Sequence, residues 1–277
     1  MVPVRDELFA RLERFYDAIP RDGAHTEAFG GLVLFVRDGA GWPFYARPRL
    51  DATEPASAAD VADVRRRQRE LGLPEAFEWV HENNPELLAV ARSAGLSVLE
   101  APLMVLDPTA LPSVTELSDV PVRLLDPAAP TFGADLAARR AVAAVGFAAP
   151  GTAVGGAGPA ARDTALVELP LDALAEEQCR TESGHRISAL AELPGQGAVA
   201  SGMAMRVDDA AEIAGIATLP SARRRGLGAA ITAALARRLL ADGVDLVFLS
   251  AGSTEIARVY LRVGFRRVGT ACIAEPA

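Results

Sequence analysis

The run Arg223-Arg224-Arg225-Gly226-Leu227-Gly228 is the part of the sequence whose residue types and spacing point most directly to chemistry. It follows the mostly apolar segment Ile213–Leu219, which we expect to be a strand. It precedes a predicted helix in which Leu227, Ile231, Leu235 and Leu239 recur every four residues. Backbone N–H groups at a helix start point outward, and the helix dipole adds positive potential there. Glycines without a Cβ let a phosphate approach the backbone closely, so the run predicts a diphosphate site.

The local charge agrees with this interpretation. From Leu219 to Ala277 there are 9 arginines against 4 acidic residues, within a chain of net charge −8. The alternative is a glycine-rich turn with solvated arginines. The strand before the run and the amphipathic helix after it favour phosphate binding. The run is not a dinucleotide fingerprint, which needs G-x-G-x-x-G and an acidic residue about 20 positions later.

The elements around this run predict a parallel crossover unit. Asp242-Gly243 ends the helix, and Val244–Leu249 is a continuous apolar segment typical of a buried strand. A strand, a helix and a second strand at this spacing place the arginine-glycine loop at the carboxyl end of the first strand.

The segment Arg223-x-x-Gly226-x-Gly228 resembles the (Q/R)-x-x-G-x-(G/A) motif of the GNAT superfamily of acyl-CoA-dependent N-acetyltransferases. The segment from Ser253 to Phe265 is similar to the N-x-x-A-x-x-x-Y-x-x-x-G-F segment of that family. It departs from the family at Ser253, where asparagine is usual, and at Ile256, where alanine is usual. The resemblance covers about Val122–Cys272 and implies an α/β (α+β) fold with a mixed sheet.

The resemblance implies acetyl-CoA as acyl donor, with no metal. The two strands Ile213–Leu219 and Val244–Leu249 would splay apart to make the thioester slot. The backbone of the first strand would pair with the pantetheine arm, and the amides of 224–229 would hold the pyrophosphate. The expected coenzyme-binding residues are Ile216, Ala217, Thr218, Arg223, Arg224, Arg225, Gly226, Leu227, Gly228, Ala229 and Ser253.

Two residues are candidates for proton transfer. Tyr260 stands where the family has its general acid and is the sole tyrosine after Tyr45; the alternative role is a tyrosine packed in the core. Glu212 opens the strand of the thioester slot, where some relatives carry the base that deprotonates the amine; the alternative is a solvated carboxylate. His185 and Glu192 are weaker candidates for the base. The loop Ala148–Asp163 could cover an acceptor.

A shift of 169 residues aligns two parts of the chain without a gap, so that Glu86 falls on Glu255 and Gly95 on Gly264. At this offset the arginine-glycine run becomes Glu54-Pro55-Ala56-Ser57-Ala58-Ala59, and Tyr260 becomes Ala91. We therefore expect two GNAT-like mixed-sheet domains, of which the first is partial and degenerate. The expected limits are residues 1–106 for that copy, 107–119 for a linker and 120–277 for the catalytic domain. The first copy would form a wall of the acceptor cleft or replace a dimer partner.

The composition excludes several classes of protein. All 28 basic residues are arginine, which removes the Walker A loop, the kinase ion pair and Schiff-base chemistry, since each needs lysine. Two cysteines and three separated histidines fit no disulfide framework or metal spacing. The acidic balance argues against nonspecific nucleic-acid binding. No apolar run approaches the roughly 18 residues of a membrane span, and the start is not a signal peptide, so we expect a soluble cytoplasmic protein.

These observations lead to one main hypothesis and two alternatives. The main one is transfer of an acetyl group from acetyl-CoA to a small-molecule or peptide amine by direct attack, in a monomer or homodimer. The first alternative is a non-catalytic acyl-CoA sensor or scaffold, which needs the phosphate loop but not Tyr260. The second is acyl transfer to an alcohol or thiol, or transfer of a longer acyl group.

Overall fold

The computed structural model describes residues 5–39 and 43–277, and the chain divides into two compact units. One contains the chain up to Leu103 together with Val268–Ala277, and the other contains Met104–Arg267. Two strands, β5 (Leu96–Leu106) and β11 (Phe265–Pro276), begin in one unit and end in the other.

The second unit is a mixed sheet with helices on both faces. Its strand order is β5, β10 (Leu246–Ser250), β9 (Ala210–Thr218), β8 (Gly197–Val207), β7 (Arg186–Leu193) and β6 (Val122–Leu124). Neighbours from β6 to β9 are antiparallel, whereas β9 and β10 are parallel. The crossover helix α8 (Leu227–Ala241) joins the parallel pair, as the sequence predicts. The mixed α/β fold expected from the sequence is confirmed.

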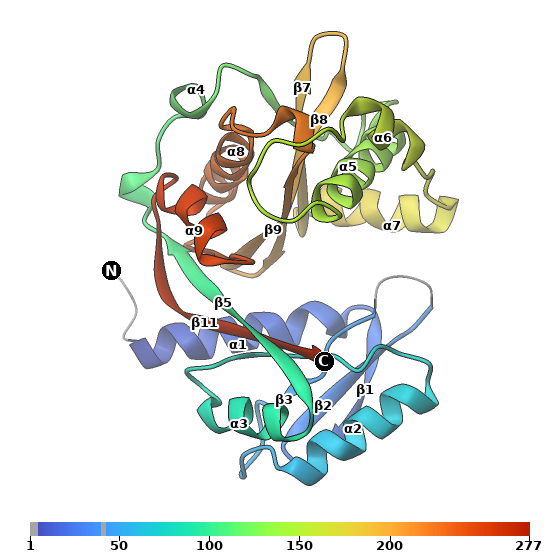
Figure 1. The fold of residues 1–277 in the computed structure, drawn as a ribbon, viewed down its shortest axis with the longest axis vertical. Helices are drawn as coiled ribbons and strands as arrows, with labels where there is room; N and C mark the ends of the chain where they lie inside the picture. The colour runs from blue at the N-terminus through green and yellow to red at the C-terminus, as the bar shows by residue number, and fades with distance from the viewer. Residues whose placement is uncertain (1–4, 40–42) are drawn as a thin grey trace. The chain divides into compact units, whose positions relative to one another are not determined.

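Helices α8 and α9 (Thr254–Leu261) lie on one side of strands β7–β9, and α5 (Phe132–Phe147), α6 (Pro159–Thr164) and α7 (Leu171–Glu182) lie on the other (Figure 1). A Cβ on Gly202 of β8 would meet Ile216 Cδ1 at 2.4 Å and Ile231 Cγ2 at 2.6 Å, so Ile216 faces α8. A Cβ on Gly146 of α5 would meet Ala217 Cβ at 3.0 Å, so Ala217 faces α5. The end of β9 is therefore held between two helices at close contact.

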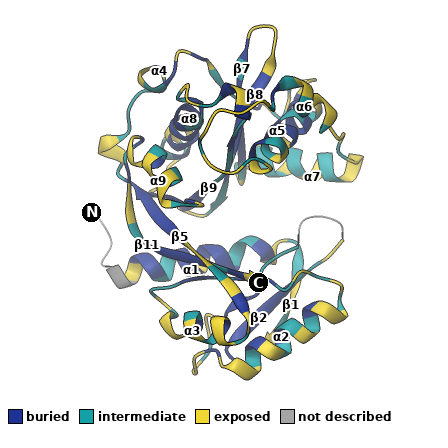
Figure 2. Cartoon of the chain, viewed as in Figure 1, coloured by how far each residue is buried: buried dark blue, intermediate teal, exposed yellow. Residues whose placement is uncertain are grey.

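Helix α8 is buried along most of its length, as its dark colour in Figure 2 shows. The predicted stripe of Leu227, Ile231, Leu235 and Leu239 is at most 2% exposed. Small alanines fill the gaps between these leucines, which lets the helix lie close to the sheet. Such a face, removed from water, stabilises the unit through the hydrophobic effect.

The segment 107–119, expected as a linker, contains a short 3₁₀ turn (Pro108–Ala110) and α4 (Val114–Leu117) and packs within the second unit. Asp107 N donates to Gly264 O at 3.0 Å, and Arg237 Nη2 donates to Pro112 O at 2.7 Å. The carbonyl of Leu117 lies against Gly226. We name residues 107–119 the strap, because they cross the unit from the turn after α9 to the start of α8.

The first unit contains α1 (Arg5–Arg21), a small sheet of β1 (Ala24–Phe29), β2 (Leu32–Arg37) and β3 (Arg47–Pro48), and then α2 (Ala58–Glu70), β4 (Phe77–Val80) and α3 (Pro85–Ser93). Strand β4 pairs antiparallel with β11 and makes one parallel bridge, Ala46 with Phe77. In the first copy the sequence also predicts a strand over 41–47; residues 41 and 42 lie outside the described residues, and Arg47 begins β3. Helix α1 and strand β1 were not predicted.

The predicted repeat is present in the order and bounds of the elements. Helices α2 and α8 begin 169 positions apart, at Ala58 and Leu227, and α3 and α9 begin at Pro85 and Thr254. Strands β4 and β10, and β5 and β11, also begin 169 positions apart. However, the last strand of each copy has joined the other: β10 neighbours β5, and β4 pairs with β11. The domain limits 1–106 and 120–277 stay a prediction, because the two units are defined here by packing and not by independent folding.

A buried ion cluster holds the first unit together. Arg47 is 3% exposed and donates to Glu78 at 2.7 Å and to Glu13 of α1 at 3.2 Å, with its guanidinium 4.5 Å from the Tyr16 ring centre. Glu13 also accepts from Val80 N at 2.7 Å. Burial raises the pKa of Glu78, against the lowering effect of Arg47. One arginine therefore supplies the counter-charge for two carboxylates.

Replacing that arginine should destabilise the chain strongly. We expect Arg47→Met to lower the free energy of unfolding by about 3–5 kcal/mol, because it leaves two buried carboxylates without a counter-charge. The control is Arg49→Met, which breaks an ion pair with the exposed Asp51 and should cost at most about 1 kcal/mol. Urea titrations at neutral pH measure both, and equal small losses would contradict the role given to Arg47.

Candidate functional site

Strands β9 and β10 separate at the place expected for the thioester slot. They pair over three positions, Leu246 with Ala210, Val247 with Ala211 and Phe248 with Glu212. Beyond Glu212, no described residue of β9 is registered with β10. On the other edge of β9 the register with β8 shifts between Ser201 and Met203, opposite Gly215, which has φ +63°. A bulge of this kind bends a strand, and here it accompanies the departure of β9 from its parallel neighbour.

The chain after β9 forms a cradle of backbone amides. A 3₁₀ turn (Pro220–Ala222) leads into the loop, where Arg224 has φ +66° and Gly226 has φ +76°. The start of α8 has no side-chain cap, and its first backbone bond runs from Ala230 N to Gly226 O at 2.9 Å. The amides of residues 225–229 have no acceptor among the described residues. Left-handed residues followed by a helix start make an anion-binding concavity.

The strap explains why glycine stands at position 226. A Cβ there would lie 1.9 Å from Leu117 O, in addition to the positive φ. A Cβ on Gly228 would make only ordinary contacts, the nearest being Ile216 Cγ2 at 3.6 Å. The two glycines of the motif are therefore not equivalent: Gly226 is required by the fold of the loop, whereas a Cβ at Gly228 fits beside Ile216 and Thr218 of β9 without a close contact.

The three arginines of the motif divide into two groups. Arg223 is half-buried, and its guanidinium donates to the carbonyls of Gly146 at 2.9 Å, Ala149 at 2.5 Å and Ala153 at 3.2 Å. It thus interacts with the negative end of α5 and holds the start of the 148–158 loop. Arg224 and Arg225 are exposed, with no partner among the described residues. These two carry the charge that remains available to a ligand.

Tyr260 and Ser253 both lie on α9. The Tyr260 ring is 7% exposed and packs edge-on against Phe265 at 6.2 Å between ring centres. Its hydroxyl has no hydrogen-bond partner in the described part of the chain, and burial raises the pKa of Tyr260 to about 12. Ser253 Oγ accepts from Ile256 N at 3.1 Å and so caps α9, which is work that an asparagine could also do.

Glu212 is 8% exposed and sits on the last rung of the β9–β10 pair. It is registered with Met205 on β8. Since Met203, two positions earlier on β8, contacts Arg139 of α5, Glu212 is on the α5 face of the sheet. The weaker base candidates lie elsewhere: His185 accepts or donates a bond with Ser183 at 2.9 Å, and Glu192 binds Arg123.

The first copy of the repeat closes its own helix start. Ser57 Oγ accepts from Asp60 N at 3.2 Å, and Asp60 accepts from Ser57 N at 2.8 Å and from Gly31 N at 3.2 Å. A carboxylate therefore occupies the position of α2 that corresponds to the open amides of α8. This arrangement agrees with the reversed charge of the first copy.

Within residues 5–39 and 43–277 no group of three or more His, Cys, Asp or Glu is placed to hold a metal ion. In the same residues no helix has the length and apolar character that crossing a membrane requires.

Because Gly226 and Gly228 differ in backbone conformation and surroundings, the two alanine substitutions form a matched test. We expect Gly226→Ala to lower the free energy of unfolding by about 2 kcal/mol or more, from the left-handed φ and the contact with Leu117. Gly228→Ala should leave stability unchanged or raise it by up to about 1 kcal/mol, since it replaces glycine within a helix. Thermal or urea unfolding of both variants measures this; equal effects would contradict the packing of the strap against the loop.

Comparisons with known proteins agree with this geometry. Residues 195–273 match the family model described as FR47-like protein, and this range includes β9, the cradle, α8 and α9. No curated protein sequence matches the chain.

Several solved structures have a similar fold. A GCN5-related N-acetyltransferase from Kribbella flavida is 22% identical, with a TM-score of 0.67 over 97% of this chain and 96% of that one. A GCN5-related N-acetyltransferase-like protein from Streptococcus suis is 14% identical, with a TM-score of 0.52 over 98% and 99% of the two chains. A tandem GNAT protein from the clavulanic acid biosynthesis pathway is 15% identical, with a TM-score of 0.51 over 89% and 78%. Residues 195–273 are thus an FR47-like segment, and the chain has the fold of the GCN5-related N-acetyltransferases.

Proposed function

We propose that this chain transfers an acetyl group from acetyl-CoA to an amine. The observation that carries the proposal is the row of amides at 225–229, which have no acceptor in the described part of the chain and lie at the end of a strand that leaves its parallel neighbour. The first feature suits a diphosphate, and the second gives an extended arm of the same molecule a strand edge to pair with. The FR47-like match and the fold support the same activity.

Each part of the site has a role in holding the donor. Arg224 and Arg225 would attract its negative charge, and the amides of Gly226 to Ala229 would bind the pyrophosphate. The backbone of Ile216, Ala217 and Thr218 would pair with the pantetheine arm. Arg223 would act on the donor through the loop it holds, since its own guanidinium is bound to carbonyl oxygens. When bound, acetyl-CoA supplies a thioester carbonyl that an amine can attack.

Proton transfer would use Tyr260 and Glu212. A phenol whose pKa is about 12 stays protonated at neutral pH, so Tyr260 is available to donate to the departing thiolate. Because the raised pKa favours the protonated form, this donor is lost only in strongly alkaline solution. Glu212, on the face of the sheet toward α5, would accept the proton of the amine, directly or through water.

Removal of the phenol hydroxyl tests this role. We expect Tyr260→Phe to lower kcat about 100-fold or more, with little change in affinity for acetyl-CoA. Thermal stability should also be unchanged, since the hydroxyl has no protein partner among the described residues. Tyr45→Phe, in the first unit, is the control. Unaltered turnover under conditions where chemistry limits the rate would reduce Tyr260 to a packing role.

The activity itself is tested in two steps with the full chain. Acetyl-CoA at 100 times its dissociation constant should stabilise the fold by about 2.7 kcal/mol, seen as a rise in Tm. A library of amines is then screened for release of free thiol from acetyl-CoA. No rise in Tm with saturating coenzyme would refute the donor. A rise without thiol release for any amine would favour an acyl-CoA binder without catalysis.

A further inference from the structure

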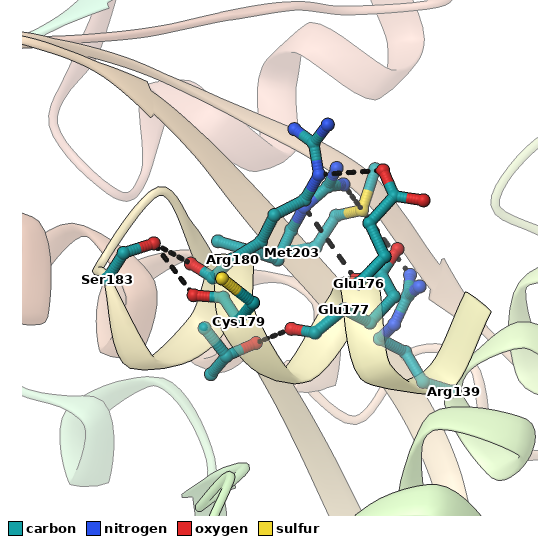
Figure 3. A network of polar contacts seen from close by, with 9 residues as sticks. Arg139, Glu176, Glu177, Cys179, Arg180, Ser183 and Met203 are labelled. Atoms are coloured by element: carbon teal, nitrogen blue, oxygen red, sulfur yellow. Dashed lines mark hydrogen bonds and ion pairs between the residues drawn. The ribbon is translucent and has the colours of Figure 1, made fainter. Parts of the chain in front are cut away.

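Two arginines meet at Met203 on the α5 face of the sheet: Arg139 of α5, which is buried, and Arg186 of β7, whose side chain is 15% exposed. Figure 3 shows Arg139 and Met203 beside the helix α7. The Nη1 atoms of the two arginines are 3.4 Å and 3.0 Å from the sulfur of Met203. A thioether is a weak acceptor, so the hydrogen bond from each guanidinium to this sulfur is weak.

Neither arginine is hydrogen-bonded to a carboxylate among the described residues. The nearest recorded carboxylate is that of Glu177 on α7, whose Oε2 is 3.9 Å from Arg186 Nε, beyond hydrogen-bond distance. Arg139 Nε, Arg186 Nε and Glu177 Oε2 are all buried without a hydrogen-bond partner in the described part of the chain. Burial lowers the pKa of Arg139 to about 10, against the raising effect of Glu177. Buried charges in proteins are normally paired and hydrogen-bonded, so these two guanidiniums leave a place for an anion.

The arginines lie close to the expected reaction site. Met203 is registered with Ala214 of β9, and Met205 with Glu212. Met203 and Glu212 are therefore diagonal neighbours on one face of the sheet, about 7–8 Å apart. A molecule that spans this distance could present an amine near Glu212 and a negative group near Arg139.

Helix α7, which lies next to these two arginines, is itself partly exposed. Helix α7 has no fully buried residue and appears teal and yellow in Figure 2. The helix that supplies Glu177 is thus held to the sheet by partly exposed contacts. Because the two Nε atoms are closed to solvent, a ligand would have to displace the edge of this helix to reach them.

We propose that Arg139 and Arg186 bind a carboxylate carried by the acceptor, so that the acceptor is an amino acid or another small amine with a carboxylate. The planar carboxylate matches the donor fork of a guanidinium and would satisfy the two orphaned Nε–H groups. The amine part of this assignment rests on the proposed function, whereas the carboxylate part rests on the arginines.

The test compares free amino acids with the matching amino-acid amides, which lack the carboxylate. In the wild type, kcat/KM for acids should exceed that for amides at least about tenfold, mainly through KM. Arg139→Met should remove this preference. Arg140→Met removes an exposed charge from the next position of the same helix and should keep it. Arg139→Met should also be at least as stable as the wild type without ligand, because it removes a poorly paired buried charge.

A binding measurement separates this proposal from the activity. N-acetyl amino acids and their amides are added without coenzyme, and Tm is measured for the wild type, Arg139→Met and Arg186→Gln. Stabilisation by the acids alone, lost in both variants, supports the carboxylate site even if no acetyl transfer is found. Equal use of acids and amides by an active wild type, or stabilisation that persists in both variants, overturns the site and leaves the proposed function intact. No stabilisation and no preference also overturns it.

Discussion

The site depends on one constraint: the first amides of α8 have no acceptor within residues 5–39 and 43–277. A helix start normally obtains a side-chain cap, and this one has none. The surrounding structure preserves the open state. Gly226 in the left-handed conformation and the Leu117 carbonyl fix the loop from one side, while Arg223 holds it from the other through the end of α5. The protein thus maintains a set of donors for an anion that it does not itself provide.

The two copies of the repeat differ in how the backbone amides at the corresponding helix start are hydrogen-bonded. Helices α2 and α8 begin at corresponding positions, yet at α2 the side chains of Asp60 and Ser57 accept hydrogen bonds from two amides of the helix start, those of Ser57 and Asp60. In the first unit, Glu13 also accepts from the amide of Val80 on β4, the strand that corresponds to β10. Two of the amides at the start of α2 are thus bonded within the chain, whereas those at 225–229 have no acceptor among the described residues. The first copy therefore keeps the architecture, while a carboxylate stands at its helix start where a diphosphate would need positive charge.

Local patterns predicted the parts of the fold that depend on neighbouring residues. The four-residue spacing of Leu227 to Leu239 predicted α8. The alignment at 169 residues predicted a repeated unit, and in the structure α2, β4 and α3 begin 169 positions before α8, β10 and α9. The parts that depend on distant contacts were not predictable in this way. Nothing near Arg223 in the sequence indicates that its guanidinium binds the carbonyls of Gly146 and Ala149. All three adjacent arginines were therefore expected to bind the coenzyme. The strap was expected as a linker because its prolines and polar residues give no periodicity. The exchange of β5 and β11 has no local signature, and Arg139 and Arg186 come together at Met203, a residue of a third element.

The central claim is that the amides at the start of α8 bind the diphosphate of coenzyme A. The most direct measurement is a two-dimensional ¹H–¹⁵N spectrum of the labelled full chain during titration with coenzyme A. Hydrogen bonding to phosphate should shift the amide protons of residues 225–229 downfield, and Ser57 to Asp60 at the start of α2 should stay in place. Unmoved resonances at 225–229 under saturating coenzyme, or equal shifts at both helix starts, would contradict the account.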